Sequence, residues 1–152
     1  MIEAANKYQY QLDHLAPPDN QWYHYDFPCR LVGHSFVSTH KGCILGKFAI
    51  ITNILTDSVV EISAQAYSDK QTYILGKDLM TGLRYLMDTY RKVCFSVIIG
   101  NPKEKVYDRH IIPLGFTICL RRAEIKDKNG TWRDIKIYEY INPNWRPQHD
   151  PN

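Results

Sequence analysis

The chain has 152 residues, of which 44% are hydrophobic, and this composition suits one folded domain with an apolar core rather than a disordered chain. The net charge is only +3, and acidic and basic residues are mixed along the chain, so nucleic acid is not an expected partner. No apolar run is long enough to span a bilayer, and the first residues lack the pattern of a signal peptide. A cytoplasmic protein without a membrane partner is therefore expected.

The N-terminal region is predicted to be short and irregular. Apolar residues at near-helical spacing predict a short helix within residues 1–15, and the turn Ala16–Asn20 ends it. The aromatic segment Trp22–Phe27 follows. It has two interpretations: a flap that buries its rings against the core, or a surface that binds a protein partner.

Three strands are predicted next, at Leu31–Thr39, Cys43–Thr52 and Val59–Tyr67. The short connections between them predict antiparallel neighbours, and hence a meander. In the third strand the apolar residues Val60 and Ile62 alternate with more polar ones, which indicates that one face of the strand is drier than the other.

A helix and a buried strand follow the meander. An apolar stripe predicts an amphipathic helix over Gly76–Tyr90, with a start as early as Thr72. Val93–Ile99 is almost continuously apolar, which is typical of a strand covered on both faces. A strand that follows a helix in this way indicates a crossover connection, and the expected fold class is therefore α/β, of the mixed α+β kind.

The last third of the chain is predicted to hold a short helix and a hairpin. Asn101-Pro102 favours a helix start, and Pro113 limits the length of that helix. The strands Phe116–Lys126 and Thr131–Ile141 are joined by a turn that contains Asn-Gly, a strong hairpin signal.

The cysteines indicate no metal site. The four are far apart and form no C-x-x-C pair. Cys94 and Cys119 lie in apolar, strand-like runs and are predicted to be small buried side chains. No feature of the sequence marks a cysteine with a lowered pKa, so a cysteine nucleophile is not indicated.

The order of elements from Val59 to Tyr140 is the most informative feature. The strand Val59–Tyr67 leads to Gly76-Lys77-Asp78 at a helix start, and Asn101 leads through a short helix to Gly115-Phe116 and a final hairpin. This order resembles the GNAT superfamily of N-acyltransferases. The resemblance implies one GNAT-like domain over residues 1–152, with a central mixed sheet, an antiparallel N-terminal meander, a crossover helix and a C-terminal hairpin. Residues 1–30 would be an abbreviated N-terminal segment, 31–141 the core and 142–152 a tail.

The resemblance also implies a chemistry: transfer of an acetyl group from acetyl-CoA to an amine that the sequence does not identify. By this likeness Glu61 is the general base and Tyr107 the general acid. Glu61 is equally well interpreted as a solvent-facing strand residue, Tyr107 as a packing residue, and His110 is a further candidate acid. Asn101 suits both a helix cap and a cofactor ligand. The residues that the resemblance assigns to cofactor binding are Gln65, Ala66, Tyr67, Leu75, Gly76, Lys77, Asp78 and Asn101.

Three features depart from the family pattern. The phosphate loop has one glycine, Gly76, where two small residues are usual, and Ile111 stands where some members carry a tyrosine. Only 30 residues precede Leu31, fewer than the family's strand and two helices need. A second hypothesis therefore stays open: a non-catalytic GNAT-like structural or assembly protein, such as a phage head-assembly protein in the host cytoplasm. The sequence leaves enzymatic activity undecided.

Overall fold

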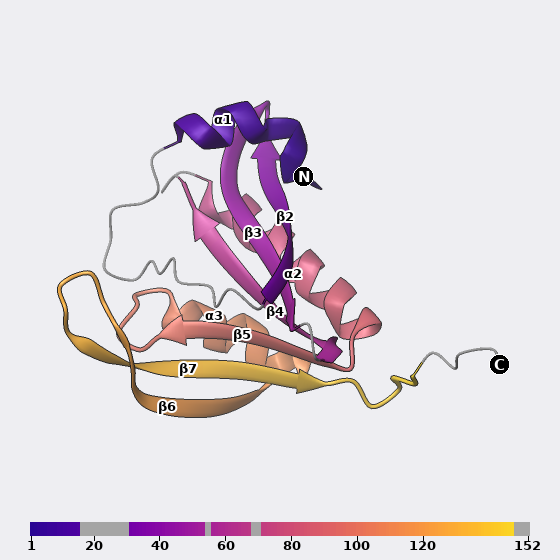
Figure 1. Ribbon diagram of the computed structural model, residues 1–152, viewed down its shortest axis with the longest axis vertical. Coiled ribbons are helices and arrows are strands. Elements are labelled where there is room, and N and C mark those ends of the chain that lie inside the picture. The colour runs from indigo at the N-terminus through magenta and orange to yellow at the C-terminus, as the bar shows by residue number, and fades with distance from the viewer. Residues whose placement is uncertain (16–30, 54–55, 68–70, 148–152) are drawn as a thin grey trace.

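The computed structural model describes residues 1–15, 31–53, 56–67 and 71–147. These residues form a seven-stranded mixed sheet with helices packed on it (Figure 1). The order of strands across the sheet is β1-β2-β3-β4-β5-β7-β6. The elements along the chain, with η for a 3-10 helix, are β1 (Ile2–Ala4), η1 (Ala5–Tyr8), α1 (Gln9–His14), β2 (Leu31–His40), β3 (Cys43–Asn53), β4 (Thr56–Ala66), α2 (Thr72–Thr89), β5 (Lys92–Ile98), α3 (Glu104–Ile111), η2 (Ile112–Leu114), β6 (Thr117–Lys126) and β7 (Trp132–Ile141).

The meander predicted for the first half is confirmed. β2 pairs antiparallel with β3, and β3 pairs antiparallel with β4. After β4 the chain passes through α2 and returns as β5, which lies parallel to β4. The predicted mixed α+β fold is therefore confirmed, including the crossover helix.

The C-terminal hairpin is also where it was predicted. β6 pairs antiparallel with β7, and Gly130 in the turn has a φ of 79°, a conformation that glycine adopts without steric cost. The Asp127 carboxylate holds the turn together, because it accepts hydrogen bonds from the N–H groups of Asn129 (2.9 Å) and Thr131 (3.0 Å). Arg133 Nε donates to the same carboxylate at 2.8 Å.

The two longer helices pack on one face of the sheet. Leu79, Leu83 and Leu86 of α2 are buried and follow helical spacing. They meet alternate strand residues, because side chains two apart on a strand share a face. The buried cluster also takes residues from α3, from β3, β4, β5 and β7, and from the residue just before β6; its members are Phe48, Val60, Ile62, Leu79, Leu83, Leu86, Val93, Phe95, Val97, Ile111, Phe116 and Tyr138.

The helix predicted within residues 1–15 is only partly correct. Its first residues form β1, which pairs with Phe36–Ser38 of β2, and a 3-10 turn precedes the short α1. The pairing is long-range, and so it overrides the local helical spacing. The aromatic segment Trp22–Phe27 lies outside the described residues.

Two predictions of burial are wrong. The strand β5 is not covered on both faces by the described residues: Val93, Phe95 and Val97 are buried, whereas Cys94 and Ser96 are only half-buried. Cys119 is exposed rather than buried. The reason is the register of the strands, which places Cys94, Ser96 and Cys119 on the face of the sheet opposite α2 and α3.

Candidate functional site

The strands β4 and β5 separate part-way along their length and form a fork in the sheet. Their parallel pairing runs from Val59 opposite Lys92 to Ile62 opposite Phe95. Beyond this point β4 continues to Ala66, still paired with β3, and β5 continues, still paired with β7. In the described part of the chain, the two edges that face each other across the fork have no strand partner.

The backbone of β4 directs polar groups into this fork. The N–H of Tyr67 donates to the carbonyl of Leu45 on β3 at 2.9 Å. Because backbone directions alternate along a strand, Gln65 also faces β3, whereas Ala64 and Ala66 face β5. Both alanines lie beyond the last β4–β5 pair, so their N–H and C=O groups point into the fork. Of Gln65, Ala66 and Tyr67, which were predicted to line a pantetheine, only Ala66 therefore directs its backbone groups into the fork.

Glu61 lies at the base of the fork, on the face opposite α2 and α3. It stands opposite Cys94, one residue before the β4–β5 pairing ends, and its Oε1 accepts a hydrogen bond from Ser96 Oγ at 3.3 Å. Desolvation raises the pKa of the Glu61 carboxyl, although the Ser96 bond and the charge of Arg121 lower it in part. The residue is nevertheless solvent-exposed, as its alternative interpretation predicted. A carboxyl in this position is suited to accept a proton.

Tyr107 approaches the fork from the other face. It is half-buried on α3, and its ring lies edge-on to Phe95, with 5.0 Å between the ring centroids and 81° between the planes. Phe95 is the last β5 residue that pairs with β4. Burial raises the pKa of the Tyr107 phenol, so the group remains protonated and able to donate. Glu61 and Tyr107 thus lie on opposite faces of the sheet rather than in one cluster.

The helix α2 begins at Thr72, the earlier of the two predicted starts. The carbonyl of Gln71 accepts hydrogen bonds from the N–H groups of Ile74 (3.0 Å) and Leu75 (3.4 Å). Helix geometry leaves the N–H groups of the first two helical residues, Thr72 and Tyr73, without a helical acceptor. Free N–H groups at the N-terminus of a helix are groups that favour anions.

The predicted phosphate-binding residues lie in the first two turns of α2, where they differ in surroundings. Leu75 packs on the sheet: a Cβ added to Gly46 of β3 would lie 2.6 Å from Leu75 Cδ1, so only glycine leaves room there. Gly76 borders open space, with nothing within 4 Å of an added Cβ. The packing of the described residues therefore does not require a glycine at position 76.

The two charged residues of this segment have different roles. Lys77 is exposed, and its Nζ lies 5.5 Å from the centroid of the Tyr73 ring. The carboxylate of Asp78 instead faces the sheet, where Oδ2 accepts hydrogen bonds from Ser38 Oγ (2.6 Å) and from the ammonium group of Met1 (2.9 Å). Asp78 therefore ties α2 to the sheet, whereas the side chain of Lys77 lies at the surface.

Asn101 lies two residues before Lys103, the N-cap of α3, and holds the turn that leads into the helix. Its Oδ1 accepts from the N–H of Lys103 at 2.9 Å, and its carbonyl accepts from the N–H of Glu104 at 2.9 Å. Glu104 Oε2 accepts from the N–H of Gly100 at 3.2 Å, which adds a second side-chain bond across the same turn.

Sequence reasoning missed two groups of this site. Ser96 is the hydroxyl-bearing residue in an otherwise apolar run, and that contrast was the available signal. No sequence pattern marks the backbone groups of Ala64, because their availability in the fork depends on where the β4–β5 pairing ends. Cys94, opposite Glu61, has a thiol pKa raised to about 11 by burial, so it is protonated at neutral pH and unsuited to act as a nucleophile.

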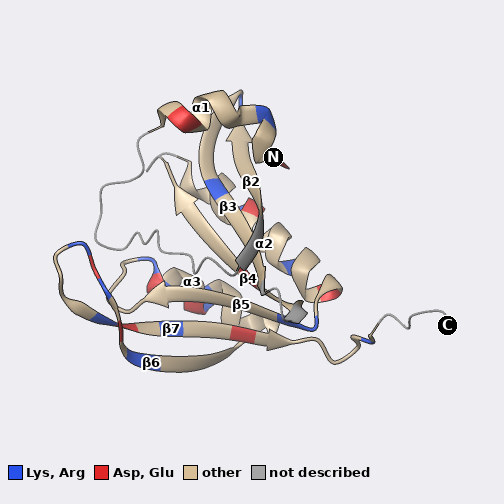
Figure 2. Cartoon of the chain, viewed as in Figure 1, with Lys and Arg blue, Asp and Glu red and all other residues tan. Residues whose placement is uncertain are grey.

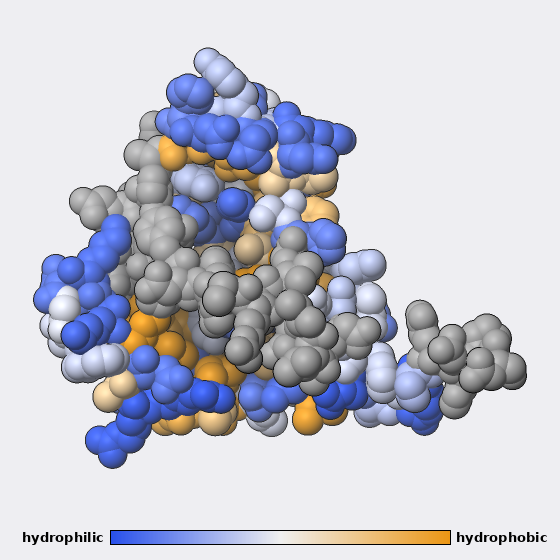
Figure 3. All heavy atoms as spheres, viewed as in Figure 1, coloured by the Kyte–Doolittle hydropathy of each residue, from blue (hydrophilic) through white to orange (hydrophobic). Residues whose placement is uncertain are grey.

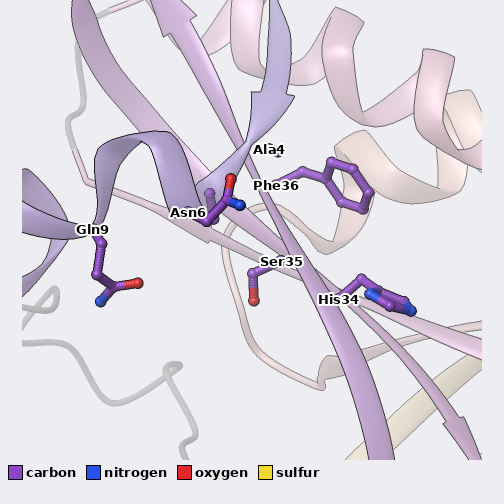
Figure 4. Close-up of a pocket in the computed structure, with 7 residues that line it drawn as sticks. Ala4, Asn6, Gln9, His34, Ser35 and Phe36 are labelled. Atoms are coloured by element: carbon purple, nitrogen blue, oxygen red, sulfur yellow. The ribbon is translucent and has the colours of Figure 1, made fainter.

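A hollow of about 430 Å³ lies between the N-terminal helical segment and β2. Figure 4 shows the polar side chains of Asn6, Gln9 and Ser35 at this hollow. Ser35 pairs with Ala49, and Ala49 with Ser63, which is two residues from Glu61. Directly paired side chains share a face, so this hollow lies on the same face of the sheet as Glu61.

Charge and metal chemistry add little to this description. Lys and Arg are interspersed with Asp and Glu along the ribbon (Figure 2). No group of three His, Cys, Asp or Glu side chains suited to a metal ion occurs among the described residues. No described helix is both long and apolar enough to cross a membrane.

Comparison with known proteins places the fold. No protein-family model and no curated protein matches the sequence. Among solved structures, similar chains include a probable acetyltransferase of the GNAT family from Chromobacterium violaceum (TM-score 0.62, 16% identity, 74% of this chain covered) and the ribosomal-protein-S5-alanine acetyltransferase of Vibrio fischeri (TM-score 0.61, 19% identity, 76% covered). This chain covers 61% and 64% of those two proteins, respectively.

A third similar structure is that of yncA from Salmonella typhimurium with its cofactor acetyl-CoA (TM-score 0.58, 19% identity, 79% of this chain and 70% of that chain covered). At these identities the likeness concerns the fold. The mixed sheet and the crossover helix α2 agree with it. The chain therefore has a GNAT-like fold, as the resemblance in its sequence predicted.

Proposed function

We propose that this protein is a GNAT-type N-acyltransferase that transfers an acetyl group from acetyl-CoA to an amine. The observation that carries the proposal is the fork between β4 and β5, with an exposed carboxyl of raised pKa, Glu61, at its base. The likeness to yncA, whose structure contains acetyl-CoA, supports the choice of acyl donor.

The residues of the fork fit a thin, amide-containing chain. Ala64 and Ala66 offer N–H and C=O groups that their own sheet does not use on that side, and they would hold the pantetheine. The N–H groups of Thr72 and Tyr73, with Lys77 nearby, would hold the pyrophosphate. Acetyl-CoA, when bound, supplies the acetyl group in activated thioester form.

The two candidate side chains would move protons from opposite faces. Glu61 Oε1 or Oε2 would accept a proton from the amine, which would enter from the face that also carries the hollow near Ser35. The Tyr107 hydroxyl, which is protonated at neutral pH and whose pKa burial raises further, would donate to the departing sulfur. The hydrogen bond from Ser96 would hold the Glu61 carboxyl in place.

Calorimetry tests the donor site before any acceptor is known. Acetyl-CoA and CoA are each titrated into the protein, with pantetheine and 3′,5′-ADP as probes of the fork and the α2 N-terminus separately. We expect saturable binding of both complete ligands and weaker binding of each fragment. A ligand at ~100 times its Kd should raise the free energy of unfolding by about 2.7 kcal/mol, which a thermal melt detects.

Two other results would argue against an acetyl-CoA-dependent enzyme. Absence of heat and of a thermal shift at millimolar acetyl-CoA would contradict the proposal. Binding without turnover on a panel of primary amines, peptide N-termini included, would instead favour the second hypothesis, a GNAT-like protein without catalysis.

A further inference from the structure

The strand β6 leaves one edge of the sheet open. It is the last strand in the sheet order, and Figure 1 shows it at the lower margin of the molecule with no described element beyond it. Every residue of β6 except Ile125 is exposed. A long open edge of this kind is a template for pairing with another strand.

The direction of the backbone groups along β6 follows from the hydrogen bonds of its neighbours. The N–H of Ile99, just after β5, donates to the carbonyl of Asp134 on β7 at 2.9 Å. Alternation along β7 then turns the backbone of Ile137 to the other side, toward its partner Cys119 on β6. The residues on either side of Cys119 therefore direct their N–H and C=O groups away from β7, to the open edge.

Those two residues are also apolar and exposed. Ile118 is 42% and Leu120 is 60% exposed, and they share one face of β6. Figure 3 shows hydrophobic surface among the charged residues at the margin formed by β6 and β7. Cys119 is exposed on the opposite face. The edge thus combines free backbone groups with side chains that water solvates poorly.

Two copies of β6 placed antiparallel can pair in few registers, because hydrogen-bonded positions must face hydrogen-bonded positions. A two-fold axis at Cys119 places Ile118 of one copy opposite Leu120 of the other. The two exposed apolar side chains of each copy then pack against those of its partner. An axis at Leu120 would place Ile118 opposite Arg122, and an axis at Arg121 would place two like charges opposite each other, which is unfavourable. Of these three registers, the one centred on Cys119 pairs the exposed apolar residues of one copy with those of the other.

We propose that β6 pairs antiparallel with β6 of a second copy of this chain, around a two-fold axis at Cys119, so that the two sheets become one.

The paired segment is short because a bulge interrupts the C-terminal half of β6. The pairing of β6 with β7 is irregular between Arg121 and Ile125, and Ala123 there has a positive φ of 46°. Its N–H donates to the Asp134 carboxylate at 2.8 Å, which fixes this bulge. The straight part of the edge is therefore Thr117–Arg121.

The geometry makes Cys119 a reporter of the pairing. The two Cys119 residues would occupy a position without direct hydrogen bonds, where Cα atoms lie about 4.5 Å apart. That separation is within the range of a disulfide. With diamide as oxidant, each thiol loses its hydrogen, one S–S bond forms, and diamide takes up both protons and both electrons.

Two measurements test the pairing in the full chain. Sedimentation velocity across micromolar to submillimolar concentrations should show a monomer–dimer equilibrium, and Leu120→Lys should weaken the dimer by at least about tenfold, since an edge lysine opposes strand pairing. Leu120 is exposed, so this change leaves the monomer's core intact; Tyr85→Lys, an exposed change on α2, is the matched control and should leave the dimer unchanged.

Cross-linking then tests the register. In a Cys29→Ser/Cys43→Ser background, diamide should give a disulfide-linked dimer that Cys119→Ser removes. With Cys119→Ser in place, Thr117→Cys combined with Arg121→Cys should restore the link, whereas either change alone should not. A monomer at all concentrations, or a dimer that Leu120→Lys leaves intact and that no β6 cysteine links, would overturn the proposal.

Discussion

Glu61 has neighbours that change its proton affinity in opposite directions. Desolvation raises the pKa of its carboxyl, whereas the hydrogen bond from Ser96 and the charge of Arg121 lower it. If Glu61 is the base, the rate falls at low pH as this carboxyl becomes protonated. Ser96→Ala removes a contribution that lowers the pKa, so the acid limb of the pH profile of kcat/KM should move to higher pH. An unchanged limb in Ser96→Ala would count against Glu61 as the base.

The two proton-transfer residues are expected to affect rate rather than donor binding. Glu61→Gln and Tyr107→Phe should each lower kcat by ~10²–10⁴. Tyr107→Phe keeps the ring contact with Phe95, so its melting temperature should stay close to that of the wild type. Steady-state kinetics and calorimetry with CoA separate the two effects. Full activity in both variants would refute the assignment of these residues as base and acid.

At the scale of elements, α2 contains two glycines, Gly76 and Gly82. Substituting each in turn distinguishes an effect on stability from an effect on ligand binding. Gly76 borders open space, and a Cβ on Gly82 would meet Ile62 Cδ1 at an ordinary 3.9 Å. Because glycine within a helix costs roughly 0.5–1 kcal/mol relative to alanine, both Gly76→Ala and Gly82→Ala should raise the free energy of unfolding by about that amount.

Only one of these changes should affect CoA. Gly76 lies near the free amides of α2, so an added methyl group would hinder a phosphate there, and we expect several-fold weaker CoA binding in Gly76→Ala. Gly82→Ala is the matched control and should bind CoA as the wild type does. Urea titrations give the stabilities and calorimetry gives the affinities. Equal affinities in the two variants would show that CoA does not approach Gly76.

The elements with strong local signals were predictable. Asn129-Gly130 specifies its hairpin, and Asn101 holds the turn that leads into α3, which ends before Pro113, because these residues act within a few positions of themselves. The start of the chain was not predictable in this way. The pairing of β1 with β2 joins residues more than thirty positions apart, and no local pattern in Ile2–Ala4 distinguishes it from a helix.

The candidate site was predictable only in outline. The resemblance selected Glu61, Tyr107 and the start of α2, but the contact of Glu61 with Ser96 spans 35 positions and depends on the parallel register. The exposure of Cys119 depends on the register of the strands, which places it on the face of the sheet opposite α2 and α3. Such features belong to tertiary structure, and hydrophobic patterns carry no information about them.

At the scale of the whole molecule, several carboxylates link stability to pH. The hydrogen bond from Arg133 holds the pKa of Asp127 below its ordinary value, as do the backbone N–H groups of the turn. The Tyr138 hydroxyl bond chiefly lowers the pKa of Asp108, which also meets Lys136 at 3.1 Å and so ties α3 to β7. A lowered folded-state pKa contributes stability that is present above the unfolded-state pKa of about 3.9 and is lost as the pH falls through the folded-state pKa.

The protein should therefore become less stable as the pH falls below about 4. Asp127→Asn and Asp108→Asn should each be less stable than the wild type at neutral pH, and each should lose less stability on acidification, because one titrating carboxylate is gone. Thermal melts from neutral to acid pH provide the comparison. Parallel curves for wild type and variants would show that these two groups do not govern acid unfolding.

The fork also divides the sheet mechanically. One panel holds β1 to β4 and the other holds β5, β7 and β6, and only the short seam between Val59–Ile62 and Lys92–Phe95 joins them through strand pairing. The helix α2 contacts strands of both panels and so also connects them across the seam. A rotation of the two panels about this seam would leave the strand pairing inside each panel intact. The width of the fork therefore depends on four residue pairs and on the packing of α2 across them.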